Sequence, residues 1–530
     1  MSARARISIV FLAICFLVSG LSSPALEAPA ARAVAESRPA ERLDLIVKAW
    51  LKRSELQNSM VGLEVMDLPS GRIYFNYNAN KRFVPASAAK VFTTACAMDT
   101  LGPDFRYRTR LLAYGRVKGD KVQGDLVLEP SQDPSLELND LNRLLQSLKE
   151  KNIRHVAGTL EMVPVSGGSD YFSPAWLVED WGQEWMPVSS NLVVDHNLAP
   201  LRALGKGLLP VVFEPFDRIA ETSLTRTLLE SGITAGWASF DARTGSVRAF
   251  RPPGPEMGGA GSLIVANPDR YNLAILTSMA KAMGLRMGSK SMSAGYRDPP
   301  QALAEHESLP LRELIETTLK ESDNLYAQQL LRTIAVKTRR PNERASLEES
   351  GLLYLKNWLL KLGIPAREIV LFDGCGLSRK NGISPHALNT VLRHMAGPQL
   401  SGPYLNLMRF EGTSRSHAGS FEFKTGAMDT VRSVSGVLRT ADNQTLALSI
   451  IVNGHKVSVG ELRVAFFSLT SQLRNIELAG TSPIPPPPAP AKPQAKRIKR
   501  GRRLAPEARH RQASPPASKK RPAGPSGKRH

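Results

Sequence analysis

The chain has 530 residues, which is too many for one compact core and predicts two or three domains. Its hydrophobic fraction of 42% and charged fraction of 22% are those of an ordinary soluble globular protein. The net charge of +21 is unevenly spread: residues 481–530 hold 14 Lys and Arg and one Glu, or +13, which leaves 21 − 13 = +8 for the first 480 residues. These totals exclude a uniformly basic protein and indicate a mildly basic body with a basic tail.

The N-terminus has the layout of a secretory signal peptide over residues 1–33. Arg4 and Arg6 precede an apolar run from about residue 7 to residue 20, and small residues suited to cleavage follow at 28–33. The apolar run is short for a membrane span, and an uncleaved anchor is the alternative interpretation. We therefore expect an exported, periplasmic protein.

The next part of the chain predicts strands followed by a helix. Residues 60–83 are typical of two strands around a Pro-Ser-Gly turn. A helix is predicted to begin near Pro85 and to end at Gly102-Pro103. From about residue 113 to 302 short apolar runs are broken by Gly, Pro and Asp, which indicates a β-rich insertion of more than one unit.

Helical periodicity returns over residues 310–335. Four apolar residues recur there on one helix face: Leu311, Leu314, Ile315 and Leu319. A strand is predicted at 420–426, then an apolar run at 444–454 and an amphipathic helix through about Leu478. Residues 481–530 are rich in Pro, Ala, Lys and Arg and are predicted to be disordered.

Several kinds of chemistry have no support in the sequence. Cleavage of the signal peptide would leave two cysteines, Cys96 and Cys375, which could pair in an exported protein, although free thiols are favoured because they lie so far apart in sequence. No HExxH, glycine-rich phosphate loop or GxSxG is present. We therefore expect no metal and no organic cofactor.

Ser87 and Lys90 stand at i and i+3 in "FVPASAAKVFTT", so a helix would place both side chains on one face. A serine hydroxyl becomes a good nucleophile only when a base removes its proton, and a lysine can be that base only if its pKa is lowered. The pair is therefore a candidate nucleophile and base. Taken alone, this common spacing favours the ordinary alternative, a helix cap.

Two further motifs follow downstream. Ser322 and Asn324 could point into one cleft, the hydroxyl relaying protons and the carboxamide holding a substrate amide; a polar helix end is the alternative. Lys424 and Thr425 would suit a carboxylate, and Gly426 would let the backbone approach a ligand. For these residues the alternative is a strand end that turns in solvent.

The order SxxK, SxN, KTG resembles that of the penicillin-recognising serine enzymes. Within that superfamily the chain resembles the D-alanyl-D-alanine carboxypeptidase/endopeptidase family typified by penicillin-binding protein 4. The resemblance covers roughly residues 40–475. It is carried by the block from "VGLEVMDLPSGRIYF" through "FRYRTRL" and by "GDLVLEPSQDPSL", "WMPVSSNLVVDHN", "LKESDNLYAQQLL" and "DGCGLSRKNGISP".

A compact class A β-lactamase is the alternative within the superfamily. Its deacylating glutamate would have to follow the SxN motif, whereas the similar string "LELN" at 136–139 precedes Ser322. The gap of 322 − 87 = 235 residues is also far too long for such an enzyme. A β-lactamase or esterase activity on the same scaffold would be told apart by rapid rather than slow penicillin turnover.

The resemblance implies a mixed α/β (α+β) fold, with a β-lactamase/transpeptidase-like catalytic domain. Such a domain has an antiparallel sheet flanked by helices, here interrupted by the β-rich insertion. The expected boundaries are 34–112 and 303–480 for the two parts of the catalytic domain, 113–302 for the insertion and 481–530 for the tail.

The resemblance also implies a role for each motif residue. Ser87 would attack the bond between two D-alanines of a peptidoglycan stem peptide, with Lys90 as base and Ser322 as proton relay. Asn324 would hold the peptide, Lys424, Thr425 and Gly426 would bind its terminal carboxylate, and the backbone N–H groups of Ser87 and Ala427 would bind the oxyanion. Expected partners are peptidoglycan peptides and β-lactams, and the sequence does not separate carboxypeptidase from endopeptidase action.

The chain departs from the family pattern at three places. Cys375 and Ala427 stand where the family usually has hydroxyl residues, and "EPSQDPSL" lacks the usual glycines before Asp133. None of these departures removes a catalytic group. A catalytically silent peptidoglycan-binding scaffold is the rival interpretation, and the intact motif residues argue against it.

The basic tail has two interpretations. It is either a solvated terminus or a segment that binds anionic polymers of the cell envelope through its charge. Nucleic acid is not an expected partner, because an exported protein would be in the wrong compartment.

Overall fold

The computed structural model describes residues 39–163, 172–177, 180, 183, 185–204, 207–210, 237–241, 246–250, 262–265, 268–292, 299–340, 343–397, 403–415 and 417–478. All of them belong to one compact unit, Met1–Ile484. The predicted signal peptide at 1–33 and the predicted tail at 481–530 lie outside the described residues.

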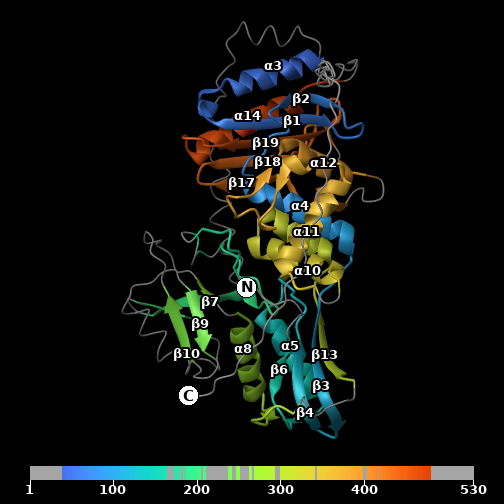
Figure 1. Cartoon of the computed structure of the whole chain (residues 1–530), viewed down its shortest axis with the longest axis vertical. Helices are drawn as coiled ribbons and strands as arrows, with labels where there is room; N and C mark the ends of the chain where they lie inside the picture. Colours follow the sequence, from blue (N-terminus) through green and yellow to red (C-terminus); the bar gives the residue numbers. More distant parts are fainter. Residues whose placement is uncertain are drawn as a thin grey trace, which may run out of the picture. The chain divides into compact units, whose positions relative to one another are not determined.

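Six of the described strands form an antiparallel sheet that joins residues 60–77 to residues 409–453 (Figure 1). In spatial order they are β16 (Arg409–Glu411), β17 (Phe421–Met428), β18 (Val431–Arg439), β19 (Thr445–Asn453), β1 (Met60–Asp67) and β2 (Ile73–Tyr77). The strands predicted at 60–83 and 420–426 are confirmed, and the apolar run at 444–454 forms β19. β18 was not predicted.

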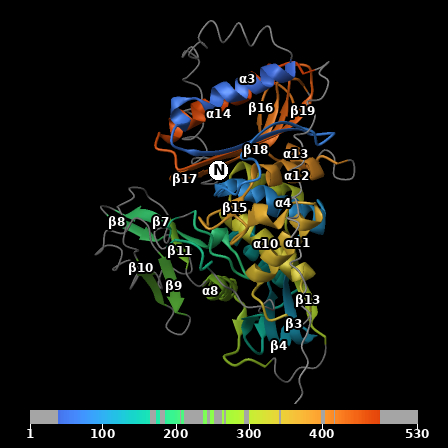
Figure 2. The ribbon, with the colours of Figure 1, turned by 45° about the horizontal axis from the view of Figure 1, so that its top comes forward.

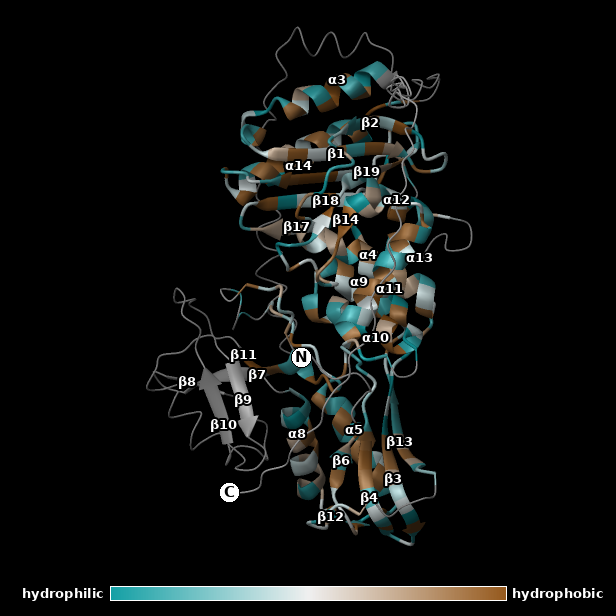
Figure 3. Ribbon diagram, in the orientation of Figure 1, coloured by the Kyte–Doolittle hydropathy of each residue, from teal (hydrophilic) through white to brown (hydrophobic). Residues whose placement is uncertain are grey.

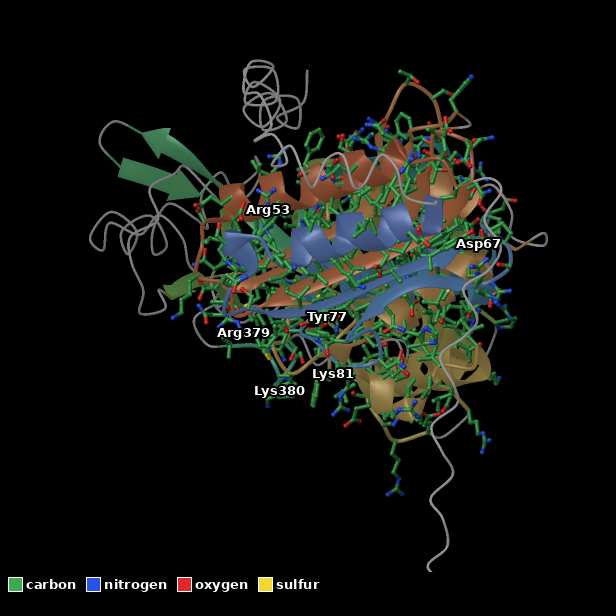
Figure 4. All side chains as sticks on the ribbon, turned by 90° about the horizontal axis from the view of Figure 1, so that it is seen from above. Arg53, Asp67, Tyr77, Lys81, Arg379 and Lys380 are labelled. Atoms are coloured by element: carbon green, nitrogen blue, oxygen red, sulfur yellow. The ribbon has the colours of Figure 1, made fainter. Side chains whose placement is uncertain are left out.

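The two faces of this sheet carry separate hydrophobic cores. Residues of β19 alternate between them, because successive side chains of a strand point to opposite faces. Leu448 and Ile450 pack under α3 (Pro39–Leu51) and α14 (Val459–Arg474). α14 is the amphipathic helix predicted to run through about Leu478, and it ends at Arg474. Figures 2 and 4 show these two helices lying over the strands, with Arg53 just beyond the end of α3. Figure 3 shows much hydrophobic colour along the strands between them and the opposite helices.

The opposite face packs against a cluster of helices. These are α4 (Lys90–Leu101), α9 (Leu311–Lys320), α10 (Asn324–Thr338), α11 (Leu347–Lys361) and α12 (Pro385–Met395). The helix predicted from Pro85 to Gly102 is confirmed as α4, preceded by a 3₁₀ turn, η2 (Ala86–Ala89). The sequence predicts helical periodicity over 310–335 with Ser322 and Asn324 at a helix end; the structure has two helices there, α9 and α10, separated at Ser322 and Asp323.

The middle of the chain forms two further sheets. One has the strand order β12-β5-β4-β3-β13, with β6 also paired to β4. Its bounds are β3 (Arg108–Lys118), β4 (Lys121–Glu129), β5 (His155–Val156), β6 (Leu160–Met162), β12 (Arg286–Met287) and β13 (Gln301–Glu307). The other has the order β10-β9-β11-β7-β8, made of β7 (Leu198–Leu204), β8 (Gly207–Pro210), β9 (Trp237–Asp241), β10 (Ser246–Phe250) and β11 (Ser262–Val265).

This region is β-rich as predicted but also contains two substantial helices. α5 (Leu138–Glu150) and α8 (Pro268–Ala282) pack their apolar residues onto the first of the two sheets. α5 begins with a capping box in which the Asp140 carboxylate accepts from the N–H of Glu137. The string "LELN", considered above as a motif, therefore leads into this helix start.

The remaining elements are short. They are η1 (Ser54–Leu56), η4 (Asp195–Asn197), η6 (Ala366–Glu368), β14 (Ile369–Val370), β15 (Gly382–Ile383) and α13 (Pro403–Asn406). One of them, η1, packs with α3 and α14. Taken together, the elements form a mixed fold with a helix-flanked antiparallel sheet interrupted by a long segment, as predicted. No helix in the described part of the chain has the length and apolar character needed to span a bilayer.

Candidate active site

Ser87 lies in the 3₁₀ turn η2, directly before α4, and its side chain is half-buried. The turn starts with Ala86 in the left-handed region, at φ +49°. It is held against the sheet because the Ser433 hydroxyl of β18 donates to the Pro85 carbonyl at 2.6 Å. The serine is therefore presented on a fixed turn at the edge of the sheet.

Gly426 allows β17 to approach this turn closely. A Cβ atom at that position would lie 2.6 Å from the Pro85 carbonyl oxygen and 2.9 Å from the Ala88 nitrogen, and it would also collide with the Ser433 hydroxyl. Real Cβ atoms essentially never come within 3.0 Å of such atoms. Only glycine therefore fits where the predicted KTG motif meets the Ser87 turn.

Lys90 is completely buried at the start of α4. Its Nζ lies 3.0 Å from Ser87 Oγ, 2.5 Å from Asn324 Oδ1 and 2.7 Å from the carbonyl oxygen of Cys375. Burial lowers the pKa of the Lys90 ammonium, and the nearby negative charges of Asp373 and Asp323 oppose this shift. The amine is thus aimed at the Ser87 hydroxyl and biased toward its neutral form.

Ser322 and Asn324 lie where α9 ends and α10 begins. Ser322 has a left-handed backbone at φ +62°, and Asp323 caps α10 by accepting from the Tyr326 N–H at 2.9 Å. Asn324 uses its carbonyl for Lys90 and donates its amide N–H to the Trp185 carbonyl at 2.6 Å. The strained residue and the cap together turn this segment toward Lys90.

Lys424 extends from β17 and is only 1% exposed. Its Nζ donates to Ser322 Oγ at 2.9 Å and to the Thr425 carbonyl at 2.6 Å. Burial, and then the positive charges of Lys90 and Arg409, hold the pKa of Lys424 well below its usual range. Thr425 and Ala427, on the same strand, are exposed to solvent.

The predicted site residues therefore come together from three parts of the chain: η2 with the start of α4, the turn between α9 and α10, and β17. One set of contacts links Ser87, Lys90 and Asn324, and another links Lys424 to Ser322. Gly426 contacts the Ser87 turn, and Thr425 and Ala427 flank it on β17. No group of three or more His, Cys, Asp or Glu side chains arranged for a metal ion occurs in the described ranges.

Sequence reasoning missed the groups that support these residues. The carbonyls of Cys375 and Trp185 act through the backbone, which leaves no side-chain signal. His196 contributes its ring nitrogen, 2.9 Å from Asp323 Oδ2. All three lie in blocks quoted above for the family resemblance, so their place in those blocks was the available signal.

The Cys375 carbonyl is aimed by a tightly bonded loop. The Asp373 carboxylate accepts from the N–H of Gly376 at 2.7 Å, the N–H of Ser378 at 2.6 Å and the Trp176 indole at 2.9 Å. The Cys375 thiol itself is buried and free, as is that of Cys96, which confirms the favoured prediction of free thiols. Burial raises the pKa of Cys96 to about 12.

Comparison with known proteins agrees with this geometry. The sequence matches the D-Ala-D-Ala carboxypeptidase 3 (S13) family over residues 44–465. It is 26% identical over 432 residues to the D-alanyl-D-alanine carboxypeptidase DacB of Haemophilus influenzae, which covers 77% of this chain and 87% of that protein. It is also 26% identical over 496 residues to a D-alanyl-D-alanine carboxypeptidase of Actinomadura sp., covering 82% and 84%.

Among solved structures, the fold is similar to that of penicillin-binding protein 4 from Haemophilus influenzae. The TM-score is 0.64 at 24% sequence identity, and the match covers 81% of this chain and 98% of that chain. A structure of the same protein in complex with a β-lactam gives a TM-score of 0.59 over the same shares at 24% identity. The predicted fold class and family resemblance are confirmed. Because the family match spans well over half of the sequence, the chain belongs to the D-Ala-D-Ala carboxypeptidase 3 (S13) family.

Proposed function

We propose that the chain is a serine-type D-Ala-D-Ala carboxypeptidase that acts on peptidoglycan stem peptides through an acyl-enzyme on Ser87. Family membership supports the reaction class. The observation that carries the assignment of residues is the buried Lys90 amine, 3.0 Å from Ser87 Oγ and with its pKa lowered by burial. A cap or surface lysine would have no reason to be buried in this way.

In the acylation step, neutral Lys90 takes the proton of Ser87 while Oγ bonds to the carbonyl carbon of the penultimate D-alanine. The carbonyl oxygen becomes an oxyanion, which the backbone N–H groups of Ser87 and Ala427 stabilise. Asn324 holds Lys90 in line through the contact of 2.5 Å, and the second N–H of its amide nitrogen, which already donates to the Trp185 carbonyl, would bind the peptide. This step forms the tetrahedral precursor of the ester, in which the positive charge gained by Lys90 balances the negative charge of the oxyanion.

The peptide bond then breaks as the leaving amine receives a proton from Ser322, and the Ser322 oxygen is reprotonated by the proton that Lys90 took from Ser87. Lys424, whose amine contacts Ser322 Oγ at 2.9 Å, tunes the acidity of that hydroxyl. Lys424 and Thr425 bind the terminal carboxylate of the substrate, and Gly426 keeps β17 close to Ser87. Free D-alanine leaves, and the remaining peptide stays on Ser87 as an ester.

Water completes the reaction by attacking this ester, with one proton passing to Ser87. The net change is the addition of one water molecule across one peptide bond. A β-lactam would acylate Ser87 by the same route, opening its ring in place of releasing an amine, and its ester would hydrolyse slowly. Slow turnover of penicillin would separate this function from a β-lactamase or esterase activity.

Labelling with a fluorescent penicillin tests the assignment of Ser87. We expect Ser87→Ala to abolish both covalent labelling and D-alanine release. Ser54→Ala is the matched control, because Ser54 also lies in a 3₁₀ turn but is exposed. Labelling that persisted in Ser87→Ala at the wild-type level would show that another residue is the nucleophile, and a wild-type chain that took no label would favour a silent scaffold.

We also propose that the enzyme cleaves crosslinks, since a crosslink and a stem terminus both present a bond after D-alanine. Mass spectrometry of sacculi digested with the protein would detect released D-alanine and separated stem peptides in one experiment. Release of D-alanine without separated crosslinks would restrict the activity to the carboxypeptidase reaction.

The proposed location is the periplasm, after removal of residues 1–33, and the basic tail is proposed to bind anionic envelope polymers. Its charge of +13 supports this binding, which salt would weaken. Truncation after residue 480 should reduce retention on cell walls at low salt, and N-terminal sequencing of the exported protein should find the cleavage site. Unchanged retention of the truncated protein would contradict the proposed role of the tail.

A further inference from the structure

The turn between α9 and α10 carries two site residues in a conformation that needs outside support. Ser322 has φ +62°, a region that residues with a side chain rarely adopt and that persists only where surrounding contacts enforce it. The proton relay and the residue that orients Lys90 both depend on this turn. The contacts that hold it are therefore candidates for a role in the reaction.

Three contacts hold the turn from outside. Arg409 of β16 donates from Nε to the Lys320 carbonyl at 2.6 Å, and Asn324 donates to the Trp185 carbonyl at 2.6 Å. The third contact is the pair between His196 Nε2 and Asp323 Oδ2, at 2.9 Å. Asp323 lies between Ser322 and Asn324, so this pair acts on the centre of the turn.

His196 is itself held in an unusual backbone. Asp195, His196 and Asn197 are three successive residues with positive φ, at 46°, 60° and 56°. The Asn197 side chain fixes this segment, donating to the Val188 carbonyl at 2.7 Å and accepting from Asn272 at 2.9 Å. A conformation of this kind aims the ring at one place with little freedom to turn away.

Asp323 uses both of its carboxylate oxygens. Oδ1 accepts the N–H of Tyr326 in the helix cap, and Oδ2 faces the His196 ring, which also stacks on the Tyr326 ring at a centroid distance of 5.5 Å. Burial alone would raise the pKa of Asp323, but the hydrogen bond and charge of His196 lower it. Among the neighbours that favour the charged carboxylate, His196 comes first, ahead of the Tyr326 N–H and the charge of Lys90.

We infer that His196 is a positioning residue for the reaction, which holds Asp323 so that Ser322 and Asn324 stay aligned with Lys424 and Lys90. This inference rests on the proposed acyl-enzyme function. It assigns a role to the segment 185–197, which precedes β7 in the middle of the chain and reaches the turn through two contacts. The site is thus completed by a part of the chain that carries none of its three motifs.

Two variants separate the hydrogen bond from simple packing. His196→Ala removes the donor, whereas His196→Gln keeps an N–H donor at nearly the same reach without the ring. His155→Gln is the matched control, because His155 Nδ1 pairs with Asp120 Oδ2 at 3.0 Å in the sheet of β4 and β5. The measurements are the acylation rate constant and the binding constant of penicillin, both per active site determined by the stoichiometry of labelling.

We expect His196→Ala to lower the acylation rate constant roughly 10- to 100-fold, as small misplacements of reacting groups do, while the binding constant changes little. His196→Gln should recover most of the loss, and His155→Gln should match the wild type. If fewer His196→Ala molecules take the label but those that do acylate at the wild-type rate, the residue is only structural and the inference is wrong. Equal loss in the Ala and Gln variants would also overturn it, and a wild-type chain without acylation at Ser87 would overturn the proposed function itself.

Discussion

The start of α4 and the middle of β17 each bury a lysine, but they surround it with opposite charges. Lys90 shares its environment with Asp373 and Asp323, which partly counteract the effect of burial on its pKa. Lys424 has Lys90 and Arg409 nearby instead, and both add to the effect of burial. Of the two amines, Lys424 is therefore the one whose pKa is lowered further.

This difference suggests how the substrate changes the site. A terminal carboxylate bound beside Lys424 would supply the negative charge that this lysine lacks and would restore its proton. A charged Lys424 would in turn disfavour the charge on Lys90, because like charges in one cleft repel. Substrate binding at β17 would thus increase the neutral fraction of the base at α4.

The largest effect should come from removing the base. Lys90→Met keeps the length and apolar body of the side chain and should reduce acylation by penicillin roughly 10²- to 10⁴-fold, the usual contribution of a general base. Stopped-flow measurement with a fluorescent β-lactam would determine the rate. A Lys90→Met variant that acylated at the wild-type rate would show that Lys424, and not Lys90, is the base.

The next largest effect should come from disturbing the close contact between β17 and the turn that carries Ser87. Gly426→Ala would place a Cβ against the Pro85 carbonyl and the Ala88 nitrogen, so β17 would have to move away from Ser87. We expect an acylation loss of about 10²-fold and a stability loss of about 1–3 kcal/mol, measured by penicillin labelling and thermal unfolding. Gly460→Ala in α14 is the control, because the nearest outside atom lies 3.8 Å from the added Cβ. Neither the acylation rate nor the stability should fall in this variant.

A shift of the pH profile tests the coupling between the lysines directly. Lys424→Met removes the positive charge that the carboxylate of a bound penicillin would restore on Lys424, so the pKa of Lys90 in that complex should rise. Because the base must be neutral, the acidic limb of the normalised acylation profile should move to higher pH by roughly one unit, within the range of one nearby charge. The exposed Lys337 provides the control variant Lys337→Met, and an unmoved limb would show that the two amines titrate independently.

The smallest effect is expected at Cys375. Its carbonyl, not its thiol, contacts Lys90, so Cys375→Ser should leave the acylation rate within about threefold of the wild type, as changes away from an interaction usually do. Ala427→Ser would report separately on the exposed position beside Gly426. A large loss in Cys375→Ser would show that the buried thiol matters for the Lys90 environment beyond its backbone.

The motif residues could be identified from the sequence because each carries its chemistry in its side chain. Ser87, Lys90 and Asn324 were predicted in this way and share one set of contacts, and Ser322 and Lys424 were predicted likewise and share another. The carbonyls of Cys375 and Trp185 could not be predicted, since any residue type supplies a carbonyl. Their direction depends on loops fixed by distant partners such as Asp373.

The prediction of secondary structure failed where tertiary contacts or buried polar residues overrode the hydrophobic periodicity of the sequence. The apolar periodicity over 310–335 continues past Ser322, and the break there is made by the left-handed backbone of Ser322 and the Asp323 cap of α10. β18 was missed because its buried positions include Ser433 and Ser435, whose hydroxyls bond to Pro85 and Ser449. Serines in a buried strand have no hydrophobic alternation to detect.

The pairing of β1 with β19 has a consequence for biosynthesis. Met60 pairs with Asn453, which lies 453 − 60 = 393 residues later, and β17, with Lys424, reaches the sheet only beside β18 and β19. A chain is made from its N-terminus, and contacts of such long range form late in folding. An unfinished chain would carry Ser87 and Lys90 without the strand that completes their cleft, so hydrolytic activity should appear only when synthesis is nearly complete.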